Sequence, residues 1–214
     1  MKNYYSHLYK HAHFNFRELS ILISLALASA LPWSIFTIAP PRLSNFQLYS
    51  YGMYFSASSL LSKPGIASFG GFFVIFWAAL AHRIIRKKYA AIITSLFAAS
   101  FVLLIDYQDY SVWSANELPW HAILGIVGFS MIGLLMESKV SSSISKTMVR
   151  GGLGSLSFFL LDGTLPPFSW AYLGTNIDYW LYPNYLVFWS LYVLRSFVLG
   201  CMGVYLASLV AKRL

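Results

Sequence analysis

Residues 66–105, IASFGGFFVIFWAALAHRIIRKKYAAIITSLFAASFVLLI, decide the fold, because two apolar runs flank a short basic segment. The runs, Ile66–Ala81 and Tyr89–Ile105, are close to the roughly 17–25 residues that carry a helix across a bilayer core about 30 Å thick. The segment between them, HRIIRKK, holds four basic residues. This pattern predicts two membrane-spanning helices joined by a basic loop.

Four further runs have the same apolar character: Leu19–Ile38, Trp120–Met136, Gly151–Leu165 and Tyr185–Val210. None alternates with the period of two that a membrane barrel strand shows. Over the 214 residues, 58% are hydrophobic and 10% charged, with a mean hydropathy of +0.63, whereas soluble domains carry roughly 25% charged residues. A soluble domain could not hide so much apolar surface. The sequence therefore predicts an all-α polytopic membrane protein, a single domain over residues 1–214 with six transmembrane helices.

The basic residues alternate from loop to loop. Twelve of the 15 lie before the first run, between the second and third, between the fourth and fifth, or after the sixth: Lys2, Lys10, Arg17, Arg83, Arg86, Lys87, Lys88, Lys139, Lys146, Arg150, Lys212 and Arg213. The opposite loops hold Arg42 and Lys63, and Arg195 lies within the sixth run. Because basic loops stay in the cytoplasm, we expect a cell-membrane protein with both termini cytoplasmic. The net charge of +8 then indicates orientation and not nucleic-acid binding.

The segment before the first run, residues 1–17 (MKNYYSHLYKHAHFNFR), mixes aromatic rings and histidines with Lys and Arg. This composition suits the cytoplasmic headgroup layer, with rings toward the bilayer and cations toward anionic lipid. We therefore predict a cytoplasmic interfacial segment here, and a frayed basic tail is the alternative.

The loops predicted to face outward, 39–65, 106–119 and 163–184, are long and aromatic, and the outer face as a whole is acidic. Aromatic rings favour the membrane interface, which alone could explain them. Loops of this length are uncommon without a role, so they could instead cover a pocket or bind a partner chain.

Arg195 is the most informative ionisable residue, because it lies ten residues into the sixth run. A charge at that depth is costly unless it faces the bundle and meets an anion. Asp162 in the fifth run is the first candidate partner. The pair is either structural or a cationic site for an anionic headgroup or substrate.

A metal site is the other possibility, since Asp106, Asp109 and His121 offer oxygen and nitrogen ligands at the outer side. Their spacing matches no known zinc or iron signature, and an interfacial histidine bonded to a neighbour is the simpler interpretation. No catalytic triad, HExxH motif or phosphate-binding glycine loop is present. We therefore expect no cofactor, and the sequence favours a non-catalytic protein over an enzyme without deciding between them.

Small residues four apart predict close helix packing at three places: Ala26 with Ala30, Gly151 with Ser155, and Ser196 with Gly200. Such pairs let helix backbones approach one another. They do not identify which helices meet.

Residues 62–84, SKPGIASFGGFFVIFWAALAHRI, and 97–136, FAASFVLLIDYQDYSVWSANELPWHAILGIVGFSMIGLLM, carry a family resemblance. They resemble the middle of a six-helix membrane family of archaea and bacteria catalogued as domain of unknown function 998. There too a histidine opens the fourth helix, where His121 stands here. The chain departs from that family where Tyr110-Ser111 replaces an outer-loop Phe-Pro. The resemblance implies six helices and no established activity.

These features lead to three hypotheses. The first is a non-catalytic accessory or structural subunit of a larger membrane complex, whose partners are the lipid bilayer and other membrane subunits. The second is a small transporter or lipid-binding permease that uses Arg195 and Asp162. The third is an outward-facing metal-dependent enzyme around His121.

Overall fold

The computed structural model describes residues 13–43, 63–106, 118–137, 144–164 and 183–214. These residues form six α-helices and one π-helical segment, and no β-strand occurs among them, which confirms the all-α class. The elements are α1 (Phe16–Leu43), α3 (Lys63–Ile85), α4 (Ala90–Asp106), α5 (Leu118–Glu137), α6 (Ile144–Phe158), η2 (Phe159–Thr164) and α9 (Pro183–Ala211). α6 begins seven residues before the apolar run at Gly151, because polar residues can extend a helix beyond an apolar run.

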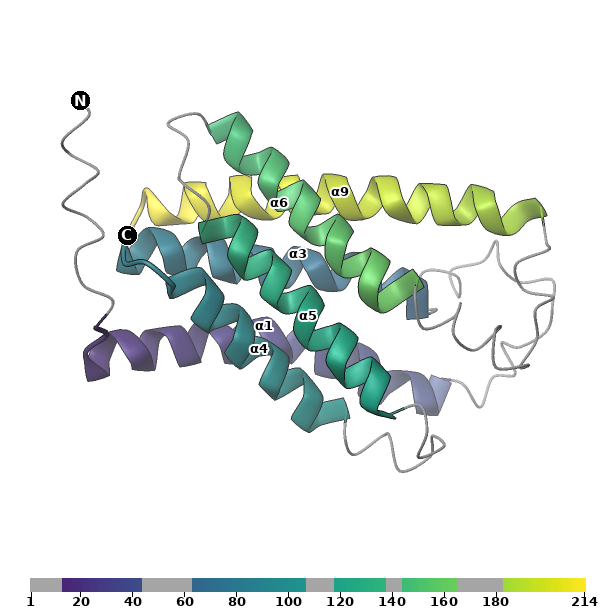
Figure 1. Cartoon of the computed structure of the whole chain (residues 1–214), viewed down its shortest axis with the longest axis horizontal. Coiled ribbons are helices and arrows are strands. Elements are labelled where there is room, and N and C mark those ends of the chain that lie inside the picture. The colour runs from purple at the N-terminus through teal and green to yellow at the C-terminus, as the bar shows by residue number, and fades with distance from the viewer. Residues whose placement is uncertain (1–12, 44–62, 107–117, 138–143, 165–182) are drawn as a thin grey trace.

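α3 is the central helix, and it contacts α1, α4, α5, α6 and α9 (Figure 1). The other helices pack around it in the order α9, α6, α5, α4, α1, each against the next. α1, α4 and α6 begin at the end of the bundle where α3, α5 and α9 finish, on the left in Figure 1. We call this the basic end, because these exposed residues lie there: Arg17, Arg86, Lys88, Lys146, Lys212 and Arg213.

Residue size separates the inside of the bundle from its outside. Ten of the 21 buried apolar residues are alanines, and the six buried polar residues are serines and a threonine. Many large aliphatic side chains point outward, as Leu104 (68% exposed) and Leu194 (60% exposed) illustrate, although a few such as Leu22 and Ile75 are buried. The described part of the bundle therefore has a core rich in small residues and an aliphatic exterior.

α6 and α9 approach most closely through the small residues that the sequence indicated. Gly151 and Gly200 face each other so tightly that a Cβ on Gly200 would meet Gly151 O and lie 2.7 Å from Ser155 Cβ. The Ser155 and Ser196 hydroxyls are 2.9 Å apart, and Ser196 also hydrogen-bonds to the carbonyl of Ser155. The prediction of close packing at Gly151/Ser155 and Ser196/Gly200 is confirmed, and the two pairs pack against each other.

Among residues with described side chains, one helix, Ser190–Ala211, is long and apolar enough to cross a membrane. The segments Gly71–Ile85, Ala90–Leu104 and Ile123–Glu137 are apolar but shorter. The six-span topology therefore stays a prediction at this point.

Candidate functional site

The start of α1 is fixed by a capping box between Asn15 and Glu18. The backbone N–H of Glu18 donates to Asn15 Oδ1 at 2.8 Å, and the backbone N–H of Asn15 donates to Glu18 Oε2 at 2.9 Å. The two bonds satisfy N–H groups that a helix start leaves without intrahelical partners. Asn and Glu three apart before an apolar run is the sequence signature of this motif, and our sequence analysis missed it.

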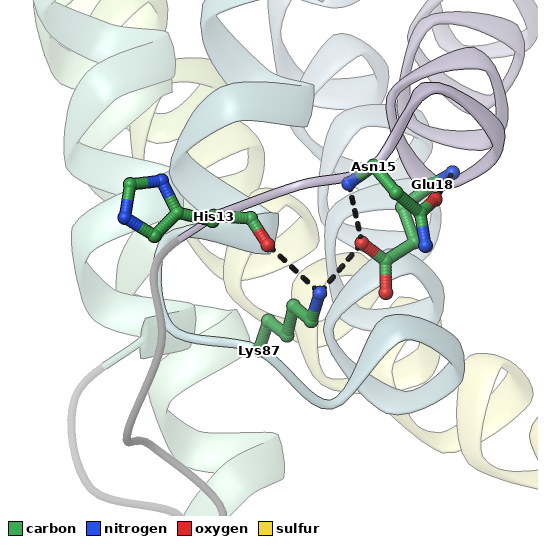
Figure 2. Close-up of polar contacts among 4 residues, drawn as sticks. All are labelled: His13, Asn15, Glu18 and Lys87. Atoms are coloured by element: carbon green, nitrogen blue, oxygen red, sulfur yellow. Dashed lines mark hydrogen bonds and ion pairs between the residues drawn. The ribbon is translucent and has the colours of Figure 1, made fainter.

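Lys87 ties this capping box to the turn between α3 and α4 (Figure 2). Its Nζ donates to Glu18 Oε2 at 2.6 Å and to the backbone carbonyl of His13 at 2.8 Å. The hydrogen bond from Lys87, followed by the one from the Asn15 backbone, lowers the pKa of the Glu18 carboxyl. Lys87 therefore holds the first turn of α1 against a segment about 70 residues away in the sequence.

In the α3–α4 turn, residues 86–89, one of the three basic side chains points into the fold and the other two point to the outside. Arg86 and Tyr89 adopt left-handed backbone conformations, with φ of 53° and 74°, which non-glycine residues adopt only when the surrounding structure holds them there. Lys87 points to Glu18, whereas Arg86 and Lys88 on either side of it are exposed. Lys88 Nζ lies 4.7 Å from the centre of the Tyr89 ring, and its hydrogen bond to that side chain raises the pKa of the lysine.

Glu137, the last residue of α5, caps the start of α4. Its Oε1 accepts the backbone N–H of Ala91 at 2.8 Å and lies 3.5 Å from Nδ1 of His82 on α3. The Glu137 side chain is only 8% exposed. A carboxylate at a helix N-terminus is favoured by the helix dipole. This contact joins α3, α4 and α5 at the basic end, and no local sequence signal links residues 46 positions apart.

Both acidic side chains at the basic end are therefore engaged within the fold. Glu18 is bonded to Lys87, and Glu137 is bonded to Ala91 and lies beside His82. The exposed cations of this end remain outside these contacts. Chemically, the described residues of this end offer a cationic surface.

Arg195 lies on α9, half-buried, with its guanidinium carbon 4.8 Å from the centre of the Tyr192 ring. Asp162 belongs to η2, and the Phe159 ring of η2 lies 6.3 Å from the Tyr192 ring. The structure thus brings the segment of Asp162 to α9, as the proposed pairing requires. The side chain of Asp162 lies outside the described residues, so its pairing with Arg195 stays a prediction.

Two residues of the predicted metal site, Asp106 and His121, belong to helix ends at the other end of the bundle. Asp106 ends α4 and His121 is in the first turns of α5, and these two helices pack together. Their side chains, and the whole of Asp109, lie outside the described residues. Within the described part of the chain, no three His, Cys, Asp or Glu side chains cluster to hold a metal ion. The metal site is untested.

No protein-family model, curated protein or solved structure matches the chain. The resemblance to the domain of unknown function 998 family therefore remains a prediction.

Proposed function

We propose that the chain is a multi-pass membrane protein with both termini in the cytoplasm, and a non-catalytic subunit of a larger membrane complex. One observation carries the membrane location: the described core is rich in alanine and serine, while many leucine, isoleucine and valine side chains are exposed on the outside of the bundle. Soluble proteins rarely expose contiguous apolar surface of this kind. Helices in lipid show this distribution, because small residues at their interfaces let the backbones approach.

Helix dimensions support the same location. α1 and α9 have 28 and 29 residues, or about 42 Å at 1.5 Å per residue, which exceeds a bilayer core of about 30 Å. Only a third of the apolar window in Ser190–Ala211 is buried inside the protein. The core helix of a soluble protein would be mostly buried, so a lipid environment explains this helix better.

A subunit role is favoured by the tight packing between α6 and α9. Gly151, Gly200 and Ser155 bring these helices into backbone contact, which leaves no room for a solute to pass between them at that level. A rigid bundle of this kind suits a scaffold. In this proposal the aromatic segments 39–65, 106–119 and 163–184, of which the second and third are also acidic, bind the neighbouring subunits.

Cysteine labelling tests the location and orientation. In a Cys201→Ala background, which removes the only native cysteine, single cysteines replace Lys212 at the basic end and Lys63 at the opposite end. A membrane-impermeant maleimide should label Lys63→Cys in intact cells and Lys212→Cys only after permeabilisation. Release of the protein from membranes by alkaline carbonate would contradict the proposal.

Purification tests the subunit role. Extraction in a mild detergent should yield the chain with stoichiometric partner proteins, and these should dissociate when the aromatic residues of segment 163–184 are replaced by serine. A homogeneous, isolated monomer from native membranes would contradict a subunit role.

A second function, a transporter or lipid-binding permease, is favoured by the π-helical geometry of η2, which contains Asp162. Single π turns within helices are frequent at functional sites. Arg195→Ala should then abolish binding of an anionic lipid or solute, whereas Leu194→Ala on the exposed face of α9 should leave it unchanged. Equal binding by both variants would exclude this role for Arg195.

A further inference from the structure

We propose that the junction of the first turn of α1 with the α3–α4 turn binds the headgroup phosphate of an anionic phospholipid through Arg17, Arg86 and Lys88. The inference rests on the proposed function, because it places the basic end at the cytoplasmic surface of the bilayer. It goes further by naming the ligand class and the residues that bind it. We call these three residues the phosphate cluster.

The charge balance at the basic end is the first argument. Of the seven acidic residues in the chain, only Glu18 and Glu137 belong to segments at this end. Of the other five, Asp106 and Asp162 belong to elements that finish at the opposite end, and Asp109, Glu117 and Asp178 follow or precede such helix ends in the sequence. Segments 1–12 and 138–143 contain Lys2, Lys10 and Lys139 and no acid. Because Glu18 is paired with Lys87 and Glu137 lies beside His82, the exposed cations leave this end with a net positive charge, which attracts anionic lipid.

The placement of the cations is the second argument. The 2.6 Å contact between Lys87 and Glu18 joins the two turns, as Figure 2 shows. Arg17 precedes Glu18, and Arg86 and Lys88 flank Lys87, so all three cations belong to the two turns that this contact joins. All three are exposed. Arg86 is also held in place, because its Nε donates to the carbonyl of Arg83 at 3.4 Å.

The aromatic neighbours of the cluster favour a lipid over a nucleic acid. Phe16, beside Arg17, is 87% exposed, and Tyr89, beside Lys88, is 40% exposed. Aromatic rings and cations mixed at one level are typical of the membrane–water interface. The aliphatic exterior of α1 and α4 begins within a few turns of the cluster, with Leu27 and Leu96. An acyl chain could lie against that exterior while its phosphate meets the cations.

Lipid titration of the full chain in a mild non-ionic detergent tests the proposal, with bound lipid counted by native mass spectrometry. Each cation near an anionic membrane surface contributes about fivefold in affinity. The double variant R86Q/K88Q should therefore bind phosphatidylglycerol roughly 30-fold more weakly than the wild type. The control K212Q/R213Q removes the same charge from the same end and should lose less than threefold. The charge-preserving variant R86K/K88R should keep wild-type binding.

Three results would overturn the proposal: equal losses in the two neutralised variants, equal affinity for phosphatidylglycerol and phosphatidylcholine, or displacement of the lipid by a short DNA oligonucleotide. Inorganic phosphate at millimolar concentration should not displace the lipid, and displacement would identify a free-phosphate site instead. Alkaline extraction separates the two proposals. Release from membranes contradicts the proposed function, whereas a protein that stays in membranes without preferring phosphatidylglycerol contradicts this inference alone.

Discussion

Gly200→Ala tests whether close approach of α6 and α9 holds the bundle together. The added Cβ would lie 2.7 Å from Ser155 Cβ and 2.8 Å from the carbonyl carbon of Gly151, and it would also meet Gly151 O. Two of these atoms belong to the backbone and cannot rotate away. The helices must therefore separate, and the packing around Ser196 must loosen.

The expected magnitude follows from two opposing effects. Overpacking a well-packed interface costs about 1–3 kcal/mol, while alanine is favoured over glycine inside a helix by roughly 0.5–1 kcal/mol. The overpacking cost is larger here because the clash is with backbone. We expect a net loss of about 1–2 kcal/mol, or roughly 3–6 °C in the unfolding midpoint of a chain of this size.

Gly154→Ala on α6 is the matched control. A Cβ at Gly154 would have its nearest neighbours, the Cα and Cγ1 of Ile132, at 3.6 Å, which is ordinary van der Waals contact. The helix preference for alanine should then leave this variant as stable as the wild type or slightly more stable. Thermal unfolding in a mild detergent, followed by the fluorescence of the seven tryptophans, measures both. If Gly200→Ala unfolds no earlier than Gly154→Ala, the close contact does not stabilise the bundle.

Three further predictions concern polar contacts. Glu137→Ala should lower the unfolding midpoint by a few degrees, because losing a helix cap costs about 0.5–2 kcal/mol, whereas Glu137→Gln keeps an acceptor for the Ala91 N–H and should lose less in the same melt. Glu18 has a lowered pKa in the fold, so its contact with Lys87 stabilises the protein above the ordinary carboxyl pKa. That stabilisation should disappear as the pH falls through the lowered value, and acid titration of Glu18→Gln should lack this loss. Ser196→Ala leaves a buried hydroxyl without its partner and should destabilise by about 1–3 kcal/mol in denaturant unfolding; no change would show that the bond is dispensable.

The sequence predicted the helices well and the contacts between them only in part. Five of the six apolar runs lie largely within one described helix, because length and hydropathy are properties of a single segment, whereas the run Gly151–Leu165 is divided between α6 and η2. The pairs Gly151/Ser155 and Ser196/Gly200 were recognisable for the same reason, since small residues four apart lie on one face of a helix. The sequence did not show that the pair on α6 packs against the pair on α9. That contact depends on the arrangement of the helices in the bundle, which a short stretch of sequence does not determine.

The contacts at the basic end show the same limit. The capping box of Asn15 and Glu18 could have been found, because both residues lie within one helical turn. The contacts of Glu18 with Lys87 and of Glu137 with Ala91 join positions 69 and 46 apart. From the sequence alone, any basic residue at this end is an equally good candidate to pair with Glu18 or with Glu137. Only the packing of α1 against the turn after α3 selects Lys87.

Hydropathy could not show which face of each helix points inward, and the proposed membrane location explains why. In lipid, the exterior of a bundle is as apolar as its interior, so helices are hydrophobic around their whole circumference. Side-chain size then indicates which face of a helix is buried, as polarity does in a soluble protein. Ala26 and Ala30 are buried while Leu27 and Leu31 beside them are exposed. Exchanging sizes within such a neighbouring pair should therefore destabilise the bundle, although overall hydropathy stays the same.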